Sequence, residues 1–121
     1  MTKEEFLQLI NITEIDEEKI KKVESIYGKF DNMFVKKLLS IKLETYFIES
    51  EDILRFLTTN EILSAPEKLN SELKNEKIIP LFDVGDNDFI VYHLDSKKWS
   101  LMNIITGVCF SETLEINDLL E

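Results

Sequence analysis

The sequence predicts a single α+β domain over residues 1–121. An antiparallel sheet, a meander in the C-terminal half, is expected to be covered on one side by N-terminal and central helices. Apolar residues recur at steps of three and four early in the chain, which indicates amphipathic helices. Short apolar runs separated by turn-forming residues fill the chain from residue 78 onward, which indicates the meander. A length of 121 residues, 44% of them hydrophobic, suits one domain with its own core.

The first third of the chain carries the signals of three helices. Thr2-x-x-Glu5 matches a capping box, and a short apolar face follows it. Residues 16–30 repeat apolar side chains every three or four positions, with lysines on the other side, which predicts an amphipathic helix. Asp31 is expected to cap a third helix, whose apolar set runs over residues 34–41.

The hydrophobic period changes in the middle of the chain. Residues 43–49 are rich in β-formers and predict a strand, whereas the apolar run 53–57 fits either a strand or a helix. Thr58-x-x-Glu61 is a second capping box and predicts the start of another helix. We interpret the polar segment 70–77 as the end of that helix and a loop.

From residue 78 the chain is expected to form strands joined by turns. The predicted strands are 78–82, 89–94, 99–104 and 108–110, and residues 111–121 are expected to form a short closing helix. Pro80 has no backbone N–H, so it suggests that its strand lies at an edge of the sheet or ends there. The nearly continuous apolar run 89–94 is typical of a central strand.

The charge balance indicates which partners the chain can bind. There are 14 Lys+Arg against 24 Asp+Glu, a formal net charge of -10. This sign repels nucleic-acid phosphates and anionic membranes, so we expect neither as a direct partner, whereas a basic protein would be attracted. The sequence has no signal-peptide pattern and no apolar run near the roughly 20 residues that a membrane span needs. We therefore expect a cytoplasmic protein.

Few residues of this chain are of the types that carry chemistry. One cysteine, Cys109, and one histidine, His93, exclude an internal disulfide framework, a Cys-rich zinc site and a zincin-type centre. A hydrolase with His93 as general base is the least favoured hypothesis, because no recognised nucleophile motif accompanies it. The acidic segment 83–88 fails the calcium-loop pattern, because the twelfth position falls on Lys97 or Leu94 instead of glutamate. We predict no metal, no cofactor and no enzymatic activity.

Several segments together match an ordered family pattern. The clearest are the apolar-proline strand Ile79-Pro80-Leu81-Phe82, the turn with Gly85-Asp86 and the strand Phe89-Ile90-Val91-Tyr92. Residues 20–39 match paired N-terminal helices, and residues 57–63 match a strand-to-helix step. Over most of its length the chain resembles the SUKH superfamily, the bacterial immunity proteins related to the SMI/KNR-type cell-wall regulator domain.

The resemblance implies an α+β fold and a non-catalytic role, in which the protein binds a toxin, often a nuclease, and blocks it by occlusion. Phe110-Ser111 matches the start of the closing helix of the family. The chain departs from the family at residues 30–32, where Leu-Pro is common, and at residues 40–42, where Asn-Gly is common. The expected partner is a basic toxin domain, and the alternative is a regulatory adaptor of the cell-wall-regulator type. Monomer and homodimer both remain open.

We place the predicted partner-binding face on the sheet-and-turn half of the chain. Residues 80–121 hold eight acids against two lysines, which accounts for six of the ten net negative charges. The candidate contact residues are Asp83, Asp86, Asp88, Asp95 and Trp99, and the central segment 49–52 is the alternative contact. Core packing is the first interpretation of Trp99, but tryptophan is also enriched among interface anchors.

Overall fold

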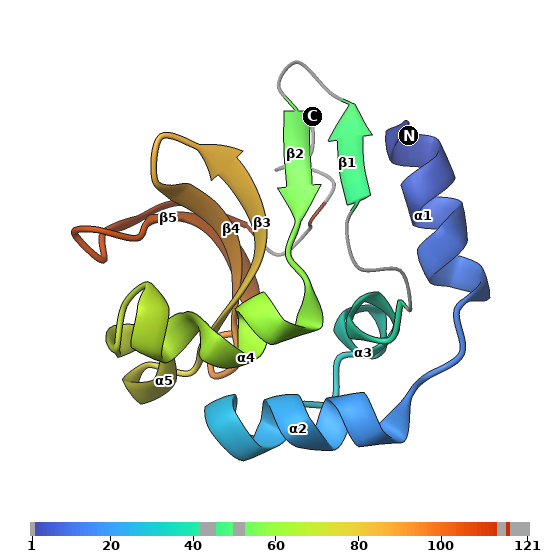
Figure 1. The fold of residues 1–121 in the computed structure, drawn as a ribbon, viewed down its shortest axis with the longest axis horizontal. Helices are drawn as coiled ribbons and strands as arrows, with labels where there is room; N and C mark the ends of the chain where they lie inside the picture. The colour runs from blue at the N-terminus through green and yellow to red at the C-terminus, as the bar shows by residue number, and fades with distance from the viewer. Residues whose placement is uncertain (1, 42–45, 50–52, 114–115, 117–121) are drawn as a thin grey trace.

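The computed structural model describes residues 2–41, 46–49, 53–113 and 116. The helices in this part of the chain are α1 (Lys3–Ile12), α2 (Glu17–Tyr27), α3 (Met33–Leu39), α4 (Thr59–Lys68) and α5 (Glu72–Asn75). The strands are β1 (Tyr46–Glu49), β2 (Ile53–Phe56), β3 (Ile78–Gly85), β4 (Asp88–His93), β5 (Lys98–Asn103) and β6 (Cys109–Thr113). The predicted α+β fold class is confirmed (Figure 1).

The described strands form one antiparallel meander. Their order in the sheet is β1-β2-β3-β4-β5-β6, and every neighbouring pair is antiparallel. The sheet therefore begins before the C-terminal half, because β1 and β2 join it. The ambiguous run 53–57 is a strand, paired with β1 on one side and β3 on the other. Residues 43–45 of the predicted first strand lie outside the described part of the chain.

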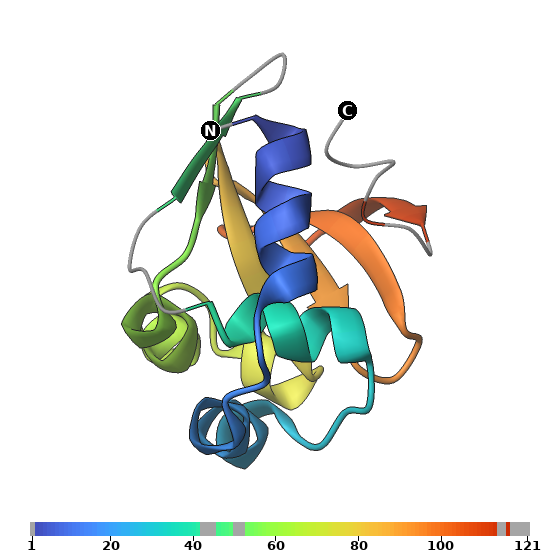
Figure 2. The same cartoon turned by 90° about the vertical axis from the view of Figure 1, so that its right-hand side faces the viewer.

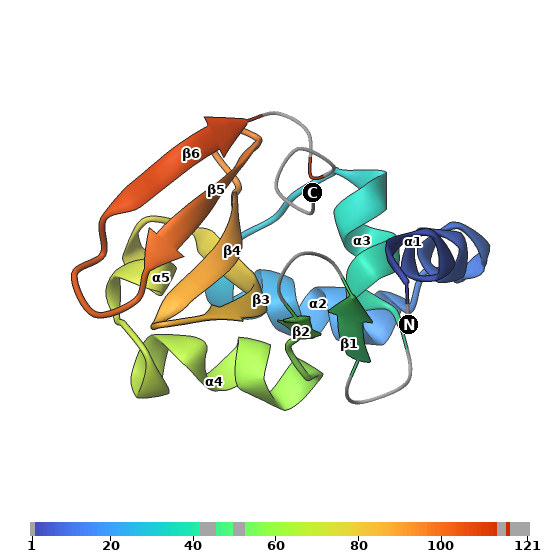
Figure 3. The same cartoon turned by 90° about the horizontal axis from the view of Figure 1, so that it is seen from above.

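The helices form two groups around the sheet. α1 and α3 pack against one face, where the Phe6 ring of α1 lies 5.7 Å from Phe56 and the Phe34 ring of α3 lies 6.2 Å from Trp99. Figures 2 and 3 show the strands curving around the side that α1 and α3 occupy. α2, α4 and α5 lie across the end of the sheet at which β3 begins (Figure 1). The β3–β4 turn is at the other end, away from these three helices.

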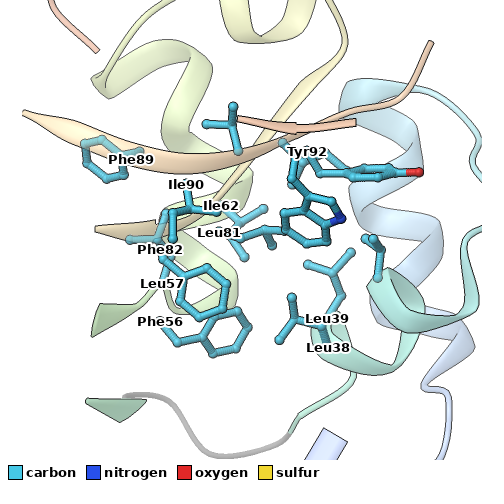
Figure 4. Close-up of a cluster of buried hydrophobic side chains, with 14 of the residues drawn as sticks. Leu38, Leu39, Phe56, Leu57, Ile62, Leu81, Phe82, Phe89, Ile90 and Tyr92 are labelled. Carbon is cyan, nitrogen blue, oxygen red and sulfur yellow. The ribbon is translucent and has the colours of Figure 1, made fainter. Parts of the chain in front are cut away.

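Aromatic side chains occupy the centre of the core. Phe6, Phe56 and Phe82 are each at most 4% exposed, and the Phe56 and Phe82 rings are 5.4 Å apart (Figure 4). Tyr92 and Trp99, on the neighbouring strands β4 and β5, have ring centroids 5.1 Å apart. Such pairs contribute about 0.5–1.5 kcal/mol each beyond the area that they bury. The cluster joins α1 to β2 and β3, so it holds both halves of the chain in one domain.

The third helix is capped one residue later than predicted. Asn32 is the N-cap, and its Oδ1 accepts the Val35 backbone N–H at 2.9 Å. Asp31, the predicted cap, has its carboxylate 3.8 Å from the Lys97 ammonium and is 85% exposed. Asparagine and aspartate are equally good N-caps, so residue type does not decide whether Asp31 or Asn32 caps α3. The backbone path from α2 into α3 decides it.

Pro80 lies in an interior strand, so its predicted place at a sheet edge is wrong. β3 has β2 on one side and β4 on the other. β2 pairs with β3 only at Asp83 and Phe82, so Pro80 lies beyond the paired part of β2. On the β4 side the register shifts between Pro80 and Phe82, as at a β-bulge. The sheet therefore accommodates a residue without an N–H in an interior strand.

Two polar segments differ from their predicted structure. Residues 72–75 form the separate short helix α5, where the end of the preceding helix and a loop were expected, and Leu73 buries its side chain completely there. At the start of α5, the Asn70 Oδ1 accepts the Glu72 backbone N–H at 2.9 Å. Residues 111–113 belong to β6, where the closing helix was expected. The rest of that predicted helix, apart from residue 116, lies outside the described residues.

Candidate functional site

The β3–β4 turn presents a free carboxylate at its tip. Gly85, Asp86 and Asn87 have φ of 93°, 54° and 65°, the left-handed region that glycine, aspartate and asparagine tolerate best. The Asp83 Oδ1 accepts the Gly85 backbone N–H at 2.9 Å and so fixes the entry to the turn. Asp86 is exposed and has no ion-pair partner among the described residues. Its charge is therefore available to a partner.

Asp83 already has a cationic partner within the fold. Arg55 donates to both carboxylate oxygens of Glu61, at 2.7 and 3.0 Å, and to the Asp83 Oδ2 at 3.4 Å. The hydrogen bond from Arg55 holds the pKa of the Glu61 carboxyl below its ordinary value. These side chains are 28% to 39% exposed, so the ion pairs contribute only modestly to stability. Asp83 links β3 to β2 and α4, and its charge is compensated.

Asp88 connects the β3–β4 turn to the β5–β6 turn. Its Oδ1 accepts a hydrogen bond from the Asn103 side-chain amide at 3.1 Å, and the Ile104 N–H donates to the Asn87 carbonyl at 2.8 Å. The Asn103 Oδ1 in turn accepts the backbone N–H groups of Ile105 and Thr106, both at 3.1 Å. The two turns are thus held side by side. We call residues 85–88 and 103–110 together the two-turn surface.

The two-turn surface carries exposed apolar side chains beside its carboxylates. Ile105 is 70% exposed, Val108 is 60% exposed and Phe110 is 41% exposed. Apolar side chains grouped on a surface are typical of an interaction site. Figure 1 places both turns on the side of the molecule remote from α1. The Asn70 amide, between α4 and α5, donates to the Ile104 carbonyl of the β5–β6 turn at 2.9 Å.

These apolar residues were not among the predicted contact residues. Val108 and Phe110 were treated as parts of a strand, and Ile105 adjoins the predicted strand 99–104. The sequence signal for their exposure was the turn-forming pair Thr106-Gly107 between apolar residues, because a tight turn exposes the side chains at its tip. Periodicity alone does not report this, because whether a strand end is covered depends on the neighbouring elements.

The other two predicted contact residues lie elsewhere. Asp95 is in the β4–β5 turn, at the end of β4 opposite Asp88, and its carboxylate is 3.7 Å from the Lys77 ammonium. Trp99 is 3% exposed and packs between Tyr92 and Phe34 in the core. The structure therefore brings together Asp86 and Asp88, and it separates them from Asp95 and from the Trp99 ring.

His93 has a polar partner that the sequence did not reveal. Its Nε2 lies 2.7 Å from the Ser100 hydroxyl on β5. Burial lowers the pKa of His93, and burial raises the pKa of the Cys109 thiol nearby. A Ser–His pair can generate a nucleophile, but Ser100 is 0% exposed, so its hydroxyl meets no substrate in this conformation. The pair satisfies two polar groups inside the sheet.

The titration of His93 provides a prediction about stability. Its pKa in the folded state is below the ordinary value of 6.5, so the unfolded chain binds this proton at a higher pH than the folded chain. The free energy of unfolding should therefore fall as the pH drops below 6.5, and His93→Gln, which does not ionise, should flatten that slope. Urea denaturation from about pH 7.5 to about pH 5 measures this difference. Parallel slopes for the two proteins would contradict the role of His93.

Comparisons of the chain with known protein families, with curated proteins and with solved structures find no match. Within the described ranges, no three His, Cys, Asp or Glu side chains converge as metal ligands. No helix in the described part of the chain is long and apolar enough to cross a membrane. The two-turn surface is the candidate site because hydrogen bonds hold its turns together and it carries exposed apolar side chains beside the Asp86 carboxylate.

Proposed function

We propose that this chain is an immunity protein that binds a basic toxin domain through the two-turn surface and inhibits it by occlusion. The observation that carries this proposal is the juxtaposition of exposed apolar side chains with the free Asp86 carboxylate. The proposal places the protein in the cytoplasm, where it would meet the toxin, and gives it no catalytic role.

Each component of the two-turn surface has a distinct role in this proposal. The apolar side chains of Ile105, Val108 and Phe110 supply contact area that is released from water on binding. Asp86 and the overall charge of -10 steer a basic partner toward the molecule and accelerate association at low salt. An apolar centre beside charged groups is the usual arrangement of protein interfaces.

A nuclease is the toxin class that this charge suits best. An enzyme that cleaves nucleic acid binds phosphates with lysine and arginine, so its active-site cleft is positive. An acidic inhibitor is attracted by the same field and can block the cleft without contacting the catalytic groups. The resemblance of the chain to the SUKH superfamily supports the same assignment, and the adaptor role of cell-wall-regulator relatives is the alternative.

Two steps test the proposal. The tagged protein is first used to capture partners from the lysate of its own host across a salt gradient. The retained protein is then expressed in a second bacterial host, alone and together with this chain. We expect one basic partner. Expressed alone it should stop growth of the second host, and co-expressed with this chain it should not. A partner that is harmless alone, or whose toxicity this chain does not relieve, would contradict immunity, and a neutral signalling or cell-wall partner would favour the adaptor.

A further inference from the structure

A concave site lies at the other end of β4 from the two-turn surface. It is a pocket of about 490 Å³ between the α2–α3 link, α3 and the β4–β5 turn. This volume lies within the range of small-molecule sites, roughly 300–1,000 Å³. Phe30 and Leu94 form the apolar part of its lining, and the polar part comes from ammonium, carboxylate and phenol groups.

The pocket is positive in a protein that is strongly negative overall. Lys29, Lys36 and Lys97 line it, together with the carboxylates of Glu24 and Asp31. Of these two carboxylates, only that of Asp31 has a cationic partner among the described residues. Glu24 accepts the Phe30 backbone N–H at 3.3 Å, and Asp31 lies 3.8 Å from the Lys97 ammonium.

The remaining two ammonium groups of the pocket are uncompensated. Lys29 and Lys36 have no ion-pair partner among the residues that the structure describes. Both can therefore donate to an anion in the pocket. The pocket lining carries three lysines against two carboxylates, so it is positive within a chain of net charge -10, which favours an anionic occupant.

The Tyr92 hydroxyl adds a further hydrogen-bond donor to the pocket. Tyr92 is 1% exposed, and its hydroxyl end points away from the core cluster in Figure 4. The hydroxyl accepts a long hydrogen bond from the Asn32 amide, at 3.4 Å, but its own proton has no acceptor among the described residues. A buried phenol normally places its proton on an acceptor. A ligand oxygen in the pocket would provide one.

We propose that this pocket binds a small organic oxyanion, a carboxylate or phosphate monoester that carries an apolar group. The anionic oxygens would lie between Lys29, Lys36 and the Tyr92 hydroxyl, and the apolar group would contact Phe30 and Leu94. A lysine ammonium only donates hydrogen bonds, and the Tyr92 hydroxyl can donate its own proton, so these groups match an oxyanion. The site is independent of the proposed partner binding, because the two surfaces lie at opposite ends of β4.

Intrinsic fluorescence offers a direct test. Trp99 is the single tryptophan, and its ring is 5.1 Å from Tyr92, so it reports on events at that side chain. The purified protein is titrated with phenyl phosphate, benzoate, inorganic phosphate and the uncharged benzyl alcohol. We expect saturable changes with phenyl phosphate and benzoate, a weaker response to inorganic phosphate and none to benzyl alcohol. Amide chemical shifts measured by NMR should move at residues 29–36 and 92–97.

Variants of the pocket make the test specific. Lys29→Gln combined with Lys36→Gln should weaken phenyl phosphate binding about tenfold, because each substitution removes one partly exposed ion pair between a lysine and the bound phosphate. Lys21→Gln with Lys68→Gln is the matched control with the same loss of charge outside the pocket and should leave binding unchanged. Tyr92→Phe keeps the ring and should weaken binding a few-fold. No saturable response in the wild type, or equal losses in the two double variants, would overturn the proposal.

Discussion

Ile105→Ser combined with Val108→Ser should weaken binding to the basic partner by about tenfold to a hundredfold, mainly through faster dissociation. Both side chains are exposed, so their removal leaves the core intact and the free energy of unfolding nearly unchanged. Asp86→Lys should act differently, because it lowers the association rate and weakens its dependence on salt. Binding kinetics with the captured partner at two salt concentrations separate the two effects.

Matched controls keep this prediction specific to the two-turn surface. Ile12→Ser removes an equally exposed isoleucine, 77% exposed, from the end of α1, and Glu67→Lys reverses an exposed acid on α4. Both should leave the kinetics unchanged. Asp83 is kept in every variant, because its reversal would break the contact with Arg55 and so confuse binding with folding. Equal effects of Ile12→Ser and the double variant would place the interface elsewhere.

Phe82→Ala should lower the free energy of unfolding by about 3–5 kcal/mol, the loss typical of a large side chain removed from a packed core. Phe82 is 1% exposed, and its ring contacts Phe6 at 5.9 Å and Phe56 at 5.4 Å. The cavity would therefore open between α1, β2 and β3, where the two halves of the chain meet. Urea denaturation monitored by Trp99 fluorescence measures the loss.

Phe110→Ala is the matched control for this core prediction. The residue type and the atoms removed are the same, but Phe110 is 41% exposed at the edge strand β6, so we expect a much smaller loss of stability. Phe82→Leu retains most of the volume and should give an intermediate loss if the alanine variant does not fold. Equal losses for Phe82→Ala and Phe110→Ala would contradict the assigned core.

Local hydrogen bonding explains why several elements could be predicted without the structure. Thr58 accepts the Glu61 backbone N–H at 3.2 Å, and the Glu61 carboxylate accepts the Thr58 N–H at 3.0 Å, as a capping box requires. Thr2 and Glu5 form the same pair of bonds at the start of α1. These interactions span three residues, so the sequence contains both partners of each. The strand run 89–94 was predictable for a similar reason, since its apolar residues are contiguous.

The errors at Pro80 and in the segment 70–77 have the opposite cause. Whether a strand tolerates proline depends on where the neighbouring strand stops, and β2 ends its pairing at Phe82. α5 exists because Leu73 is buried and the Asn70 Oδ1 accepts the Glu72 backbone N–H, although the other residues of this helix are polar. Neither condition can be read from a window of local sequence.

The sequence by itself determined the α+β class, the two capping boxes and the acidic character. Only the tertiary structure decided how the acids are grouped. It pairs Asp83 with Arg55, places Asp95 at the far end of β4 and leaves Asp86 free beside Ile105 and Val108. The physical reason is that composition fixes charge and local propensity, whereas exposure and ion pairing depend on contacts between residues far apart in the chain.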